Sequence, residues 1–493
     1  MTCFRIIREE GNLFQTPVVK KKPFLYSDDL QQKGTLMDAL FLSRVQFALT
    51  SMFHYIYPPL SIGLGLMLVI FEGIYIKTKD PLYKEIARFW TKIFALTFAL
   101  GVATGVVQLF GFGTNWARYS VYVGDVFGSA LGAEGVFAFF LESGFLGLAL
   151  FGWERVSARM HYFSTICVCL GAHFSALWIV VANSWMQTPA GFDVVIKNGA
   201  ARAHVTDFWQ MVFNPSSIDR LVHVLLGCWL AGIFLVISVT AYYLMKRRHL
   251  EFAKPMMKIS LLVAAITLLL QLVSADSTAS GVVRNQPAKM AAMEGVYQTA
   301  EATPLTLLGW VNDKEQTVKG IQIPGFLSFL CYRNWTQAVP GLDQIPLEDR
   351  PPVQIVFQSY HLMIWMWGFM ALAVMLGLIQ YYRGRLMESK RLLFWMILSV
   401  GFPQIANQAG WVTAEVGRQP WIVYGLLRTS EGLSTNITAA QVMSSIIMFS
   451  IIFSLLLVLF LYLLDHKIKE GPNLLEGERQ VKPLVYRNLF SKR

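Results

Sequence analysis

Residues 442–464 read VMSSIIMFSIIFSLLLVLFLYLL and contain no charged side chain. A helix rises about 1.5 Å per residue, so roughly 20 apolar residues are needed to cross the hydrocarbon core of a bilayer. This segment is long enough, and Asp465 follows it directly. It is therefore expected to span a membrane as one helix.

Other apolar segments of similar length precede this one. They lie at residues 48–76, 93–113, 127–152, 163–186, 221–245, 257–275, 355–381 and 392–408. Of the 493 residues 55% are hydrophobic and only 15% are charged, whereas a soluble domain carries about a quarter charged residues. The sequence therefore predicts an all-α, polytopic membrane bundle of about nine transmembrane helices. Residues 37–275 would supply the first six and residues 354–465 the last three.

The loops between these segments predict an orientation. The net charge is +11, and Lys and Arg gather after every second segment. Because basic loops usually face the cytoplasm, these loops and the basic tail at 466–493 are expected on the cytoplasmic side. The N-terminus and the remaining loops then lie outside. This charge distribution argues against a nucleic-acid partner.

Two polar stretches differ from the rest of the chain. Residues 1–36 contain a Lys triplet at 20–22 and no long apolar run, so they are either a flexible extension or lie upstream of a true start at Met37. Residues 276–353 form a long connection with several Pro and Gly, which the charge pattern places outside. Connections of this length are usually functional or disordered.

Motifs of soluble enzymes are missing from the sequence. We find no Walker loop, zinc pair or nucleophile elbow. The five Cys residues do not predict a disulfide framework, and Cys167 and Cys169 are expected in the helical core. Lys289 and Glu294 in the long connection are five apart, so on spacing alone they are solvated charges.

The stretch GWVTAEVGRQPW at 410–421 follows the segment 392–408. A carboxylate, Glu415, and a guanidinium, Arg418, are costly at the edge of a hydrocarbon layer unless each has a partner. Glu415 could ligate a metal or a haem iron at an open site, or it could pair with Arg418 at the i,i+3 spacing. Gly417 between them argues against that pair, because it is expected to end the helix.

The first apolar segment carries His54 shortly before Pro58 and Pro59. Pro58 has no N–H, so the carbonyl of His54 loses its helical partner and a kink is expected there. A neutral His54 could bind a metal or could hydrogen-bond a neighbouring helix. Arg44, at the outer mouth of the same segment, could pair with an anionic group such as a haem propionate or could act as an interfacial anchor.

The third apolar segment contains two carboxylates, Glu134 and Glu142, with Ser143 beside the second. On one continuous helix, eight residues correspond to about 80° of net rotation and a rise of about 12 Å. Two acidic residues inside a membrane helix predict a proton relay or a cation site, or else a structural role beside a basic group.

A histidine and a methionine on two helices could bind a haem. His223 opens one apolar segment, and His361 and Met363 lie at similar depth in another. His361 and Met363 are two apart, so they cannot both face one haem, and either could be the ligand. His173 is expected to be a hydrogen-bonded structural residue. The other histidines, in loops or at helix ends, are expected to carry no role: His161, His204, His249 and His466.

Together these residues closely resemble subunit I of the cytochrome bd-type quinol oxidases. The resemblance covers nearly the whole chain from about Met37. The stretches that carry it are LSRVQFA at 42–48 with His54, FGTNW at 112–116, EGVFAFFLES at 134–143, ANSWMQ at 182–187, GW at 410–411 and GRQPW at 417–421.

This resemblance implies a set of haem ligands. His223 and Met363 are similar to the axial pair of a low-spin haem b. His54 and Glu415 are similar to the ligands of two high-spin haems, one haem b and one haem d, although the third haem could also be haem b.

Further roles follow from the same resemblance. Arg44 and Arg418 are similar to partners of haem propionates, and Trp411 to an aromatic residue between haems. Lys289 and Glu294 match the pair of a quinol-binding loop, the Q loop, at 276–353.

The resemblance also implies a reaction. Glu134, Glu142 and Ser143 would bring protons from the cytoplasm to the oxygen site, and Glu134 would also lie near a haem. Quinol would be oxidised at the outer face and O₂ reduced to water, so charge would be separated without a pump. The expected setting is the bacterial inner membrane, with a second membrane subunit (subunit II) and small single-helix accessory subunits as partners.

Two departures from the family pattern stand out. Some relatives carry Arg at the position of His361, and the loop at 276–353 lacks the insert of long-loop members, which indicates the short-loop form. Two other readings compete with an oxidase. A subunit that only relays electrons would leave His54 and Glu415 without a role, and a transporter using Glu134 and Glu142 would carry no haem.

Overall fold

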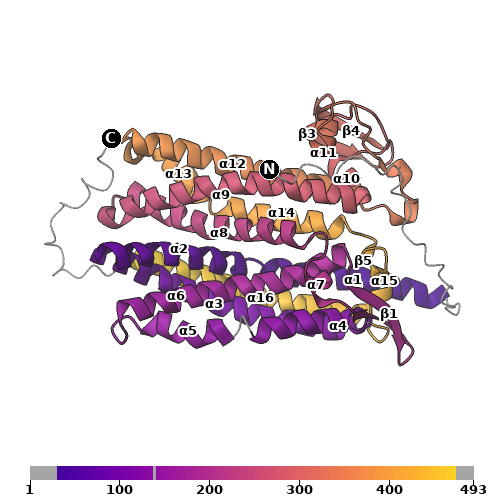
Figure 1. Ribbon diagram of the computed structural model, residues 1–493, viewed down its shortest axis with the longest axis horizontal. Helices are drawn as coiled ribbons and strands as arrows, with labels where there is room; N and C mark the ends of the chain where they lie inside the picture. The colour runs from indigo at the N-terminus through magenta and orange to yellow at the C-terminus, as the bar shows by residue number, and fades with distance from the viewer. Residues whose placement is uncertain (1–29, 137–139, 473–493) are drawn as a thin grey trace.

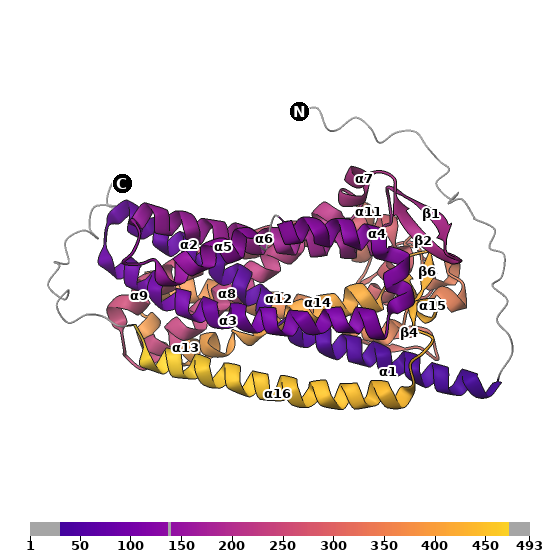
Figure 2. The same ribbon diagram turned by 90° about the horizontal axis from the view of Figure 1, so that it is seen from below.

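The computed structural model describes residues 30–136 and 140–472. Long helices lie side by side along the longest axis of the molecule (Figure 1). Their bounds are α1 (Leu30–His54), α2 (Tyr57–Thr78), α3 (Pro81–Thr114), α6 (Ala158–Gln187), α8 (Ser217–Met245), α9 (Leu250–Asn285), α12 (Val353–Tyr382) and α16 (Ala439–Glu470). Helix α16 packs along α1 and α3 at one edge of the bundle (Figure 2).

Among the described residues, seven helical stretches are long and apolar enough to cross a membrane. They are Ala39–Thr78, Pro81–Thr114, Ala158–Gln187, Ser217–Met245, Leu250–Asn285, Leu347–Tyr382 and Ala439–Glu470. The expected all-α membrane bundle is confirmed. The first stretch contains the predicted kink: α1 ends at His54, and α2 begins at Tyr57 with prolines in its first turn.

The predicted segment at 127–152 is not a single long helix in the described residues. Helix α4 (Ala117–Glu134) begins earlier than expected and ends at the first carboxylate, and α5 (Phe140–Phe151) carries the second. Residues 137–139 lie outside the described part of the chain. The backbone stays helical at Gly135, which has φ −56° and ψ −43°.

The predicted segment at 392–408 is also divided. Helix α13 (Lys390–Leu398) is followed by α14 (Gly401–Val416). Pro403 cannot donate a hydrogen bond to the carbonyl of Ser399, so the helical ladder is broken at this point. Helix α14 then continues past the predicted end and includes Glu415 in its last turn.

Short elements gather at one end of the bundle, together with α4 and α10 (Pro287–Glu294) (Figure 1). Three two-stranded antiparallel sheets lie there: β1 (Phe192–Lys197) with β2 (Ala200–Val205), β3 (Leu305–Asn312) with β4 (Thr317–Ile323), and β5 (Trp421–Val423) with β6 (Leu427–Arg428). In the first sheet Phe192 pairs with Val205. The short helices are α7 (Phe208–Val212), α11 (Phe326–Tyr332) and α15 (Thr429–Gly432). Helix α9 runs to Asn285, so the connection predicted from residue 276 begins as helix.

The core of the bundle is centred on α2, α3, α8 and α9. Helices α2 and α8 touch through glycines, because a Cβ at Gly63 would come within 2.4 Å of the carbonyl oxygen of Cys228. Small residues allow membrane helices to approach this closely. Cys167 and Cys169 are buried and free, as expected of core residues.

Candidate functional site

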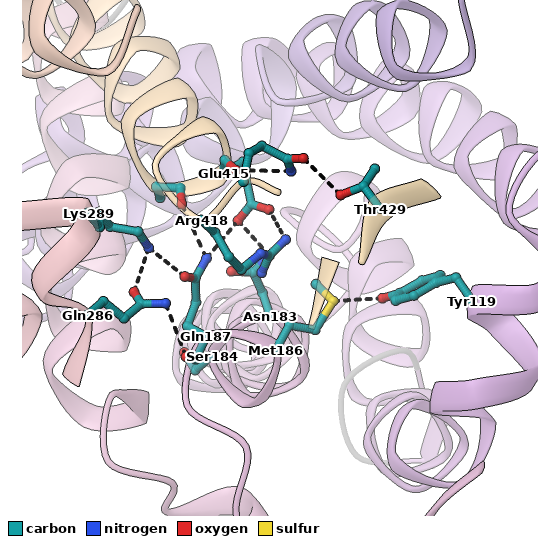
Figure 3. A network of polar contacts seen from close by, with 12 residues as sticks. Tyr119, Asn183, Ser184, Met186, Gln187, Gln286, Lys289, Glu415, Arg418 and Thr429 are labelled. Carbon is teal, nitrogen blue, oxygen red and sulfur yellow. Dashed lines mark hydrogen bonds and ion pairs between the residues drawn. The ribbon is translucent and has the colours of Figure 1, made fainter. Parts of the chain in front are cut away.

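A network of polar side chains joins α6, α10 and α14 near the end of the bundle that carries the short elements (Figure 3). At its centre, Oε1 of Glu415 accepts hydrogen bonds from Asn183 Nδ2 at 3.1 Å and from Gln187 Nε2 at 3.2 Å. The other carboxylate oxygen, Oε2, forms an ion pair with Arg418. Two segments that are far apart in the sequence, the end of α6 and the end of α14, are thereby tied together.

The ion pair of Glu415 and Arg418 is the one that Gly417 was expected to disfavour. That expectation was wrong. Gly417 has φ −67° and ψ −14°, so the backbone stays right-handed through the last turn of α14 and brings the two side chains together. The glycine serves another purpose, because a Cβ here would come within 2.8 Å of Lys289 Cγ.

Arg418 carries more hydrogen-bonding capacity than its described neighbours use. Its side chain is only 3% exposed, and its Nε and Nη1 atoms have no partner among the described residues. A buried guanidinium is always charged, so an unpaired N–H edge on it is costly. These unpaired N–H groups of Arg418 could therefore bind an anionic group beside Glu415.

Lys289 is buried on α10 and is only 4% exposed, so its interpretation as a solvated charge was wrong. Its Nζ donates to Gln187 Oε1 at 2.5 Å and to Gln286 Oε1 at 2.6 Å. Burial, and then the nearby cations Arg220 and Arg418, hold the pKa of Lys289 well below its usual value.

Glu294 ends α10 and is also buried, at 7% exposure, so the same correction applies to it. Burial raises the pKa of Glu294 to about 7, and a hydrogen bond with Tyr360 opposes that rise. Its Oε2 atom has no described partner. A carboxyl group with a pKa near neutrality can exchange protons readily under physiological conditions.

A cavity of about 270 Å³ lies beside the polar network. His223 from α8 and Met363 from α12 both line it, as does Trp411 from α14. Lys289 and Arg220 add two basic groups to the lining of this cavity. The cavity therefore brings a histidine and a methionine from two helices together with groups that could neutralise an anion.

Two contacts set the positions of these candidate ligands. Gln271 Nε2 lies 3.2 Å from Nδ1 and 3.1 Å from Nε2 of His223, and because an amide nitrogen only donates, it donates to whichever ring nitrogen is unprotonated. A metal bound at that nitrogen would replace this hydrogen bond. Met363 lies against α14, where a Cβ at Gly410 would come within 3.0 Å of its Sδ. With these contacts in place, both side chains line the cavity.

His361, the alternative ligand, is held elsewhere. Its Nδ1 lies 2.8 Å from the carbonyl oxygen of Phe357, and its Nε2 lies 2.7 Å from that of Thr306 on β3. Both ring nitrogens therefore face backbone carbonyl oxygens. His361 links the β3–β4 hairpin to α12 and does not line the cavity, which favours Met363.

His54 stands at the C-terminal end of α1, and its Nδ1 lies 3.0 Å from Thr104 Oγ1. The Thr104 hydroxyl proton is directed to the carbonyl oxygen of Leu100 at 2.8 Å, so the hydroxyl oxygen accepts from Nδ1–H. Nε2 of His54 is then unprotonated. Both proposed roles, a structural hydrogen bond and a ligating nitrogen, are compatible with this arrangement.

His173 is a structural residue, as expected. Its Nδ1 lies 2.7 Å from the carbonyl oxygen of Cys169, and its Nε2 accepts from Trp229 Nε1 at 2.9 Å.

The two carboxylates of the third predicted segment contact the same neighbouring helix. Glu134 accepts a hydrogen bond from Ser175 of α6 at 2.5 Å. Glu142 packs against α6 at Gly171, where a Cβ would come within 2.8 Å of Glu142 Cβ. Glu134 lies on α4 and Glu142 on α5, and residues 137–139 between these helices lie outside the described part of the chain. Ser143 is exposed on α5, next to Glu142.

The remaining predicted site residues, Arg44 and Trp411, lie in different surroundings. Arg44 is exposed on α1 and is not part of the Glu415 network. Trp411 packs edge-on against Tyr55, with ring centroids 5.5 Å apart. Both residues line the cavity, and Tyr55 directly follows His54 in the chain.

Arg220 was missed from the sequence, where it stands just before the predicted segment 221–245. Its guanidinium donates to Asn183 Oδ1 at 2.5 Å and lies over the ring of Trp411 at 5.7 Å. A position three residues before His223, almost one helical turn, was the available signal.

Residues 42–472 of the chain match the family described as Cytochrome bd terminal oxidase subunit I. The chain belongs to this family. Among curated relatives, "Cytochrome bd ubiquinol oxidase subunit 1" of Bacillus subtilis (strain 168) is 38% identical over 88% of this chain and 94% of its own length. "Cytochrome bd-II ubiquinol oxidase subunit 1" of Escherichia coli (strain K12) is 33% identical over 90% of this chain and 99% of its own length.

A solved structure agrees with these relatives. The bd oxidase from Geobacillus thermodenitrificans has a chain that is 30% identical, with a TM-score of 0.82 over 88% of this chain and 99% of that one. Membership in the bd oxidase subunit I family confirms a helical membrane oxidoreductase of the quinol:oxygen type. It also places the chain in the bacterial inner membrane as a multi-pass protein.

The residues present fit the haems that a bd oxidase family member is expected to bind. The cavity holds one histidine and one methionine from different helices, which is a known axial pair for haem iron. Arg418 offers unpaired buried N–H groups to an anionic substituent. Gly410 leaves space for Met363 in the cavity wall.

Proposed function

We propose that this chain is the haem-bearing catalytic subunit of a terminal quinol oxidase. It oxidises quinol at the outer face and reduces O₂ to water with protons taken from the cytoplasm, so that charge is separated without pumping. The single observation that carries this proposal is the shared cavity of His223, Met363 and Lys289 in a bd oxidase family chain. This cavity supports the proposal because candidate haem ligands and a candidate quinol-binding group all line it.

Four side chains are proposed to hold the haems. His223 and Met363 would bind the low-spin haem b, and His54 and Glu415 would bind the two high-spin haems, one haem b and one haem d, or haem b in both. Bound haem iron supplies one-electron transfer and, at an open axial position, reaction with O₂. The part of the protein is to hold ligands and counter-charges in place.

Lys289 and Glu294 are proposed to act on quinol. Both lie on α10, and both have pKa values shifted towards neutrality by burial. Oxidation of a quinol releases protons, and an ionised Glu294 can take one of them through the oxygen that has no other partner. Lys289, at the cavity wall, would orient the quinol head group. The relatives act on ubiquinol or, in one putative case, menaquinol.

Arg418, Arg220 and Arg44 are proposed to neutralise anionic groups of the cofactors. Arg418 is supported by its two unpaired nitrogens. Arg220 lines the same cavity as His223 and would neutralise an anionic group bound there. Arg44 projects from α1, ten residues before His54, and its role follows from the resemblance alone.

Glu142 and Glu134 are proposed to pass protons inward, with Ser143 beside the first. Helix α6 supports this arrangement, since it contacts Glu142 at Gly171 and donates to Glu134 from Ser175. Those two contact points are four residues apart, about one helical turn on the same face of α6. A proton leaving Glu142 would therefore have Glu134 as the next carboxylate along α6.

The charge pattern of the loops supports the proposed orientation. The N-terminus and the Q loop would lie outside, and the C-terminus would face the cytoplasm. Subunit II is the proposed second membrane subunit, with small single-helix accessory subunits as further partners. Apolar side chains exposed along α9, among them Ile266 and Leu269, leave a face for lipid or a neighbouring subunit.

A reduced-minus-oxidised visible spectrum of the purified complex, with extraction of its haems, tests this proposal. Low-spin haem b together with high-spin haem bands is expected. Absence of any haem band would contradict the oxidase and favour a transporter. Low-spin haem b alone would contradict the high-spin sites and favour an electron relay.

A further inference from the structure

A second buried polar cluster lies far from the Glu415 network, near the opposite end of α2 and α6. His161 belongs to the first turn of α6 and was expected to carry no role, but it is only 2% exposed. Its Nδ1 lies 2.6 Å from Oε1 of Glu72 on α2, which is 1% exposed. Thr165, one turn along α6, donates to Oε2 of Glu72 at 2.6 Å.

The hydrogen bonds determine where protons can lie in this cluster. His161 Nε2 lies 3.2 Å from the carbonyl oxygen of Ala149, which only accepts, so Nε2 carries a proton. A second proton is shared between Nδ1 of His161 and Oε1 of Glu72. The pair is then neutral overall whether that proton is on nitrogen or oxygen. Two alternative positions for one proton are the property expected of a proton-holding site.

One aromatic layer separates this pair from a cluster of surface charges. The ring of Trp153 lies against His161, with centroids 3.8 Å apart. The guanidinium of Arg88 lies over the Trp153 ring, 5.5 Å from its centroid. Arg88 also forms ion pairs with Glu154 and Glu85. Glu154 is largely exposed, with 68% of its side chain accessible, so water reaches the outer side of this layer.

Towards the interior, a small cavity adjoins Thr165. Its volume is about 10 Å³, which is about the space of one water molecule. Thr165, Thr91 and Cys169 supply its polar lining atoms. Cys169 lies one turn beyond Thr165 on α6, and Gly171, which contacts Glu142, follows two residues later. The cavity thus lies between the buried pair and Glu142.

We propose that Glu72 and His161 form a proton-holding site on the path by which protons reach Glu142. This inference rests on the proposed function, in which Glu142 receives protons from the cytoplasm. It adds residues that the motifs and the haem site do not use. The site lies near the end of α2 that carries Lys77, and the basic residues at and after this helix end predict the cytoplasmic face.

The transfer needs only the movement of protons between oxygen and nitrogen atoms. Glu72 takes the shared proton from Nδ1 of His161. Rotation of its carboxyl group then exchanges the two oxygens and presents the proton to Thr165 Oγ1. As Thr165 accepts it, the original hydroxyl proton passes to water in the small cavity and on to the Glu142 carboxylate. A proton that arrives from water on the side of Trp153 is then taken up at the Glu72 carboxylate or at Nδ1 of His161, the two positions left open, so the cluster returns to its first state.

A structural role, in which the pair only joins α2 to α6, makes a different prediction. Glu72→Gln retains the size of the side chain and can still hydrogen-bond, but it cannot carry a proton. Thr165→Val keeps the Glu72–His161 pair intact and removes only the hydroxyl that leads inward. The matched control is Cys167→Ala, a buried substitution on the same helix outside the cluster.

The experiment uses the complete oxidase complex reconstituted in vesicles. It measures O₂ consumption, proton uptake from the side that bears Lys77, and the visible haem spectrum. Glu72→Gln is expected to slow turnover and proton uptake at least tenfold, and Thr165→Val about threefold, with normal haem spectra. The ratio of rates in H₂O and D₂O should rise in both variants, and Cys167→Ala should match the unmodified enzyme in all measurements.

Each other outcome is decisive. Turnover within twofold of the unmodified enzyme in an assembled Glu72→Gln complex overturns the inference. If that variant does not assemble, unchanged turnover and an unchanged isotope ratio in Thr165→Val overturn it instead. A Glu142→Gln complex measured in parallel distinguishes failure of the proposed proton path from failure of the proposed site at Glu72. Normal turnover in Glu142→Gln contradicts the proposed proton path itself, whereas slow Glu142→Gln with normal Glu72→Gln contradicts only the site at Glu72.

Discussion

The sulfur of Met363 lies directly against the backbone of Gly410 on the facing helix. A Cβ at Gly410 would come within 3.0 Å of Met363 Sδ, which is closer than such contacts normally allow. Both residues line the cavity that also contains His223. The glycine of the GW motif therefore has a packing role: it allows α14 to approach α12 while Met363 remains at the cavity.

Gly410→Ala is expected to displace Met363 and to reduce the low-spin haem signal by about half or more, with slower quinol oxidation. The matched control is Gly368→Ala on α12, where no neighbour lies within 4 Å of an added Cβ. Alanine is favoured over glycine in a helix by roughly 1 kcal/mol, so the control should be at least as stable as the original. Reduced-minus-oxidised spectra of both variants provide the measurement. An unchanged low-spin band in Gly410→Ala would contradict the expected displacement.

Met363→Leu is expected to remove the low-spin signal and quinol oxidation, because leucine has no sulfur to bind iron. His361→Ala should retain that signal, since both its ring nitrogens are hydrogen-bonded to the carbonyls of Phe357 and Thr306. Loss of the outer-hairpin contact should instead lower thermal stability. Spectra and melting curves of the two variants distinguish these effects. The reverse pattern of spectra would show that the ligand assignment is wrong.

Glu415→Ala is expected to lose one high-spin haem, measured by haem extraction and by the spectrum after addition of carbon monoxide. The substitution also leaves Arg418 without its carboxylate partner, and an unpaired buried charge is destabilising by roughly 3–5 kcal/mol. The double variant Glu415→Ala with Arg418→Met removes that charge as well and serves as the control. If the single variant contained its full set of haems and turned over normally, Glu415 would not be a ligand.

Quinol oxidation is expected to rise as pH increases through about 7, the pKa to which burial raises Glu294. Below that pH the carboxyl group is protonated and cannot accept a proton from quinol, and above it the base form predominates. Glu294→Gln should lower the rate about tenfold or more and flatten this part of the profile. Steady-state rates between pH 5 and pH 9 are the measurement. A profile of unchanged shape in Glu294→Gln would assign the titration to another group.

The raised pKa of Glu294 also bears on stability, with a definite sign. Between the usual carboxyl pKa and about 7, the folded protein binds more protons at this position than the unfolded chain does. Its contribution to the free energy of unfolding is therefore complete at low pH and falls as pH rises to about 7. Glu294→Gln should remove this part of the pH dependence in thermal melts.

Lys289→Met is expected to raise the KM for quinol several-fold, because the amine at the cavity wall is lost. Its two acceptors, Gln187 and Gln286, would also lose a donor. The control is Lys314→Met, an exposed lysine in the same outer connection. Steady-state titration with a soluble quinol measures both variants. Equal KM values in the two would contradict a role for Lys289 in quinol binding.

Particular residues show how far the sequence could be interpreted. The kink after His54 was predictable because Pro58 removes a local hydrogen bond. The buried state of Lys289 and Glu294 was not, because it depends on how α10 packs against α12 and the end of α14. The pairing of Glu415 with Arg418 was judged from the usual tendency of glycine to end a helix. Helix α14 does end before Gly417, but the φ and ψ of Gly417 stay right-handed, so the two side chains still meet.

The contacts of two other residues, Arg220 and His161, could not be predicted from the sequence around them. Arg220 was absent from the list of candidates because its partners, Asn183 and Trp411, come from helices distant in the sequence. His161 was dismissed at a helix end, although Glu72 of α2 lies 2.6 Å away.

The sequence by itself determined that this chain forms a membrane helix bundle, because hydrophobic length and charge content are local properties that the bilayer acts on directly. It also determined the family through ordered motifs. Tertiary structure alone decided which polar groups meet. It turned both ring nitrogens of His361 towards backbone carbonyls, buried Lys289, and set Met363 against Gly410. Hydrogen bonds and packing within a bundle depend on the relative rotation and depth of helices, which no single segment specifies.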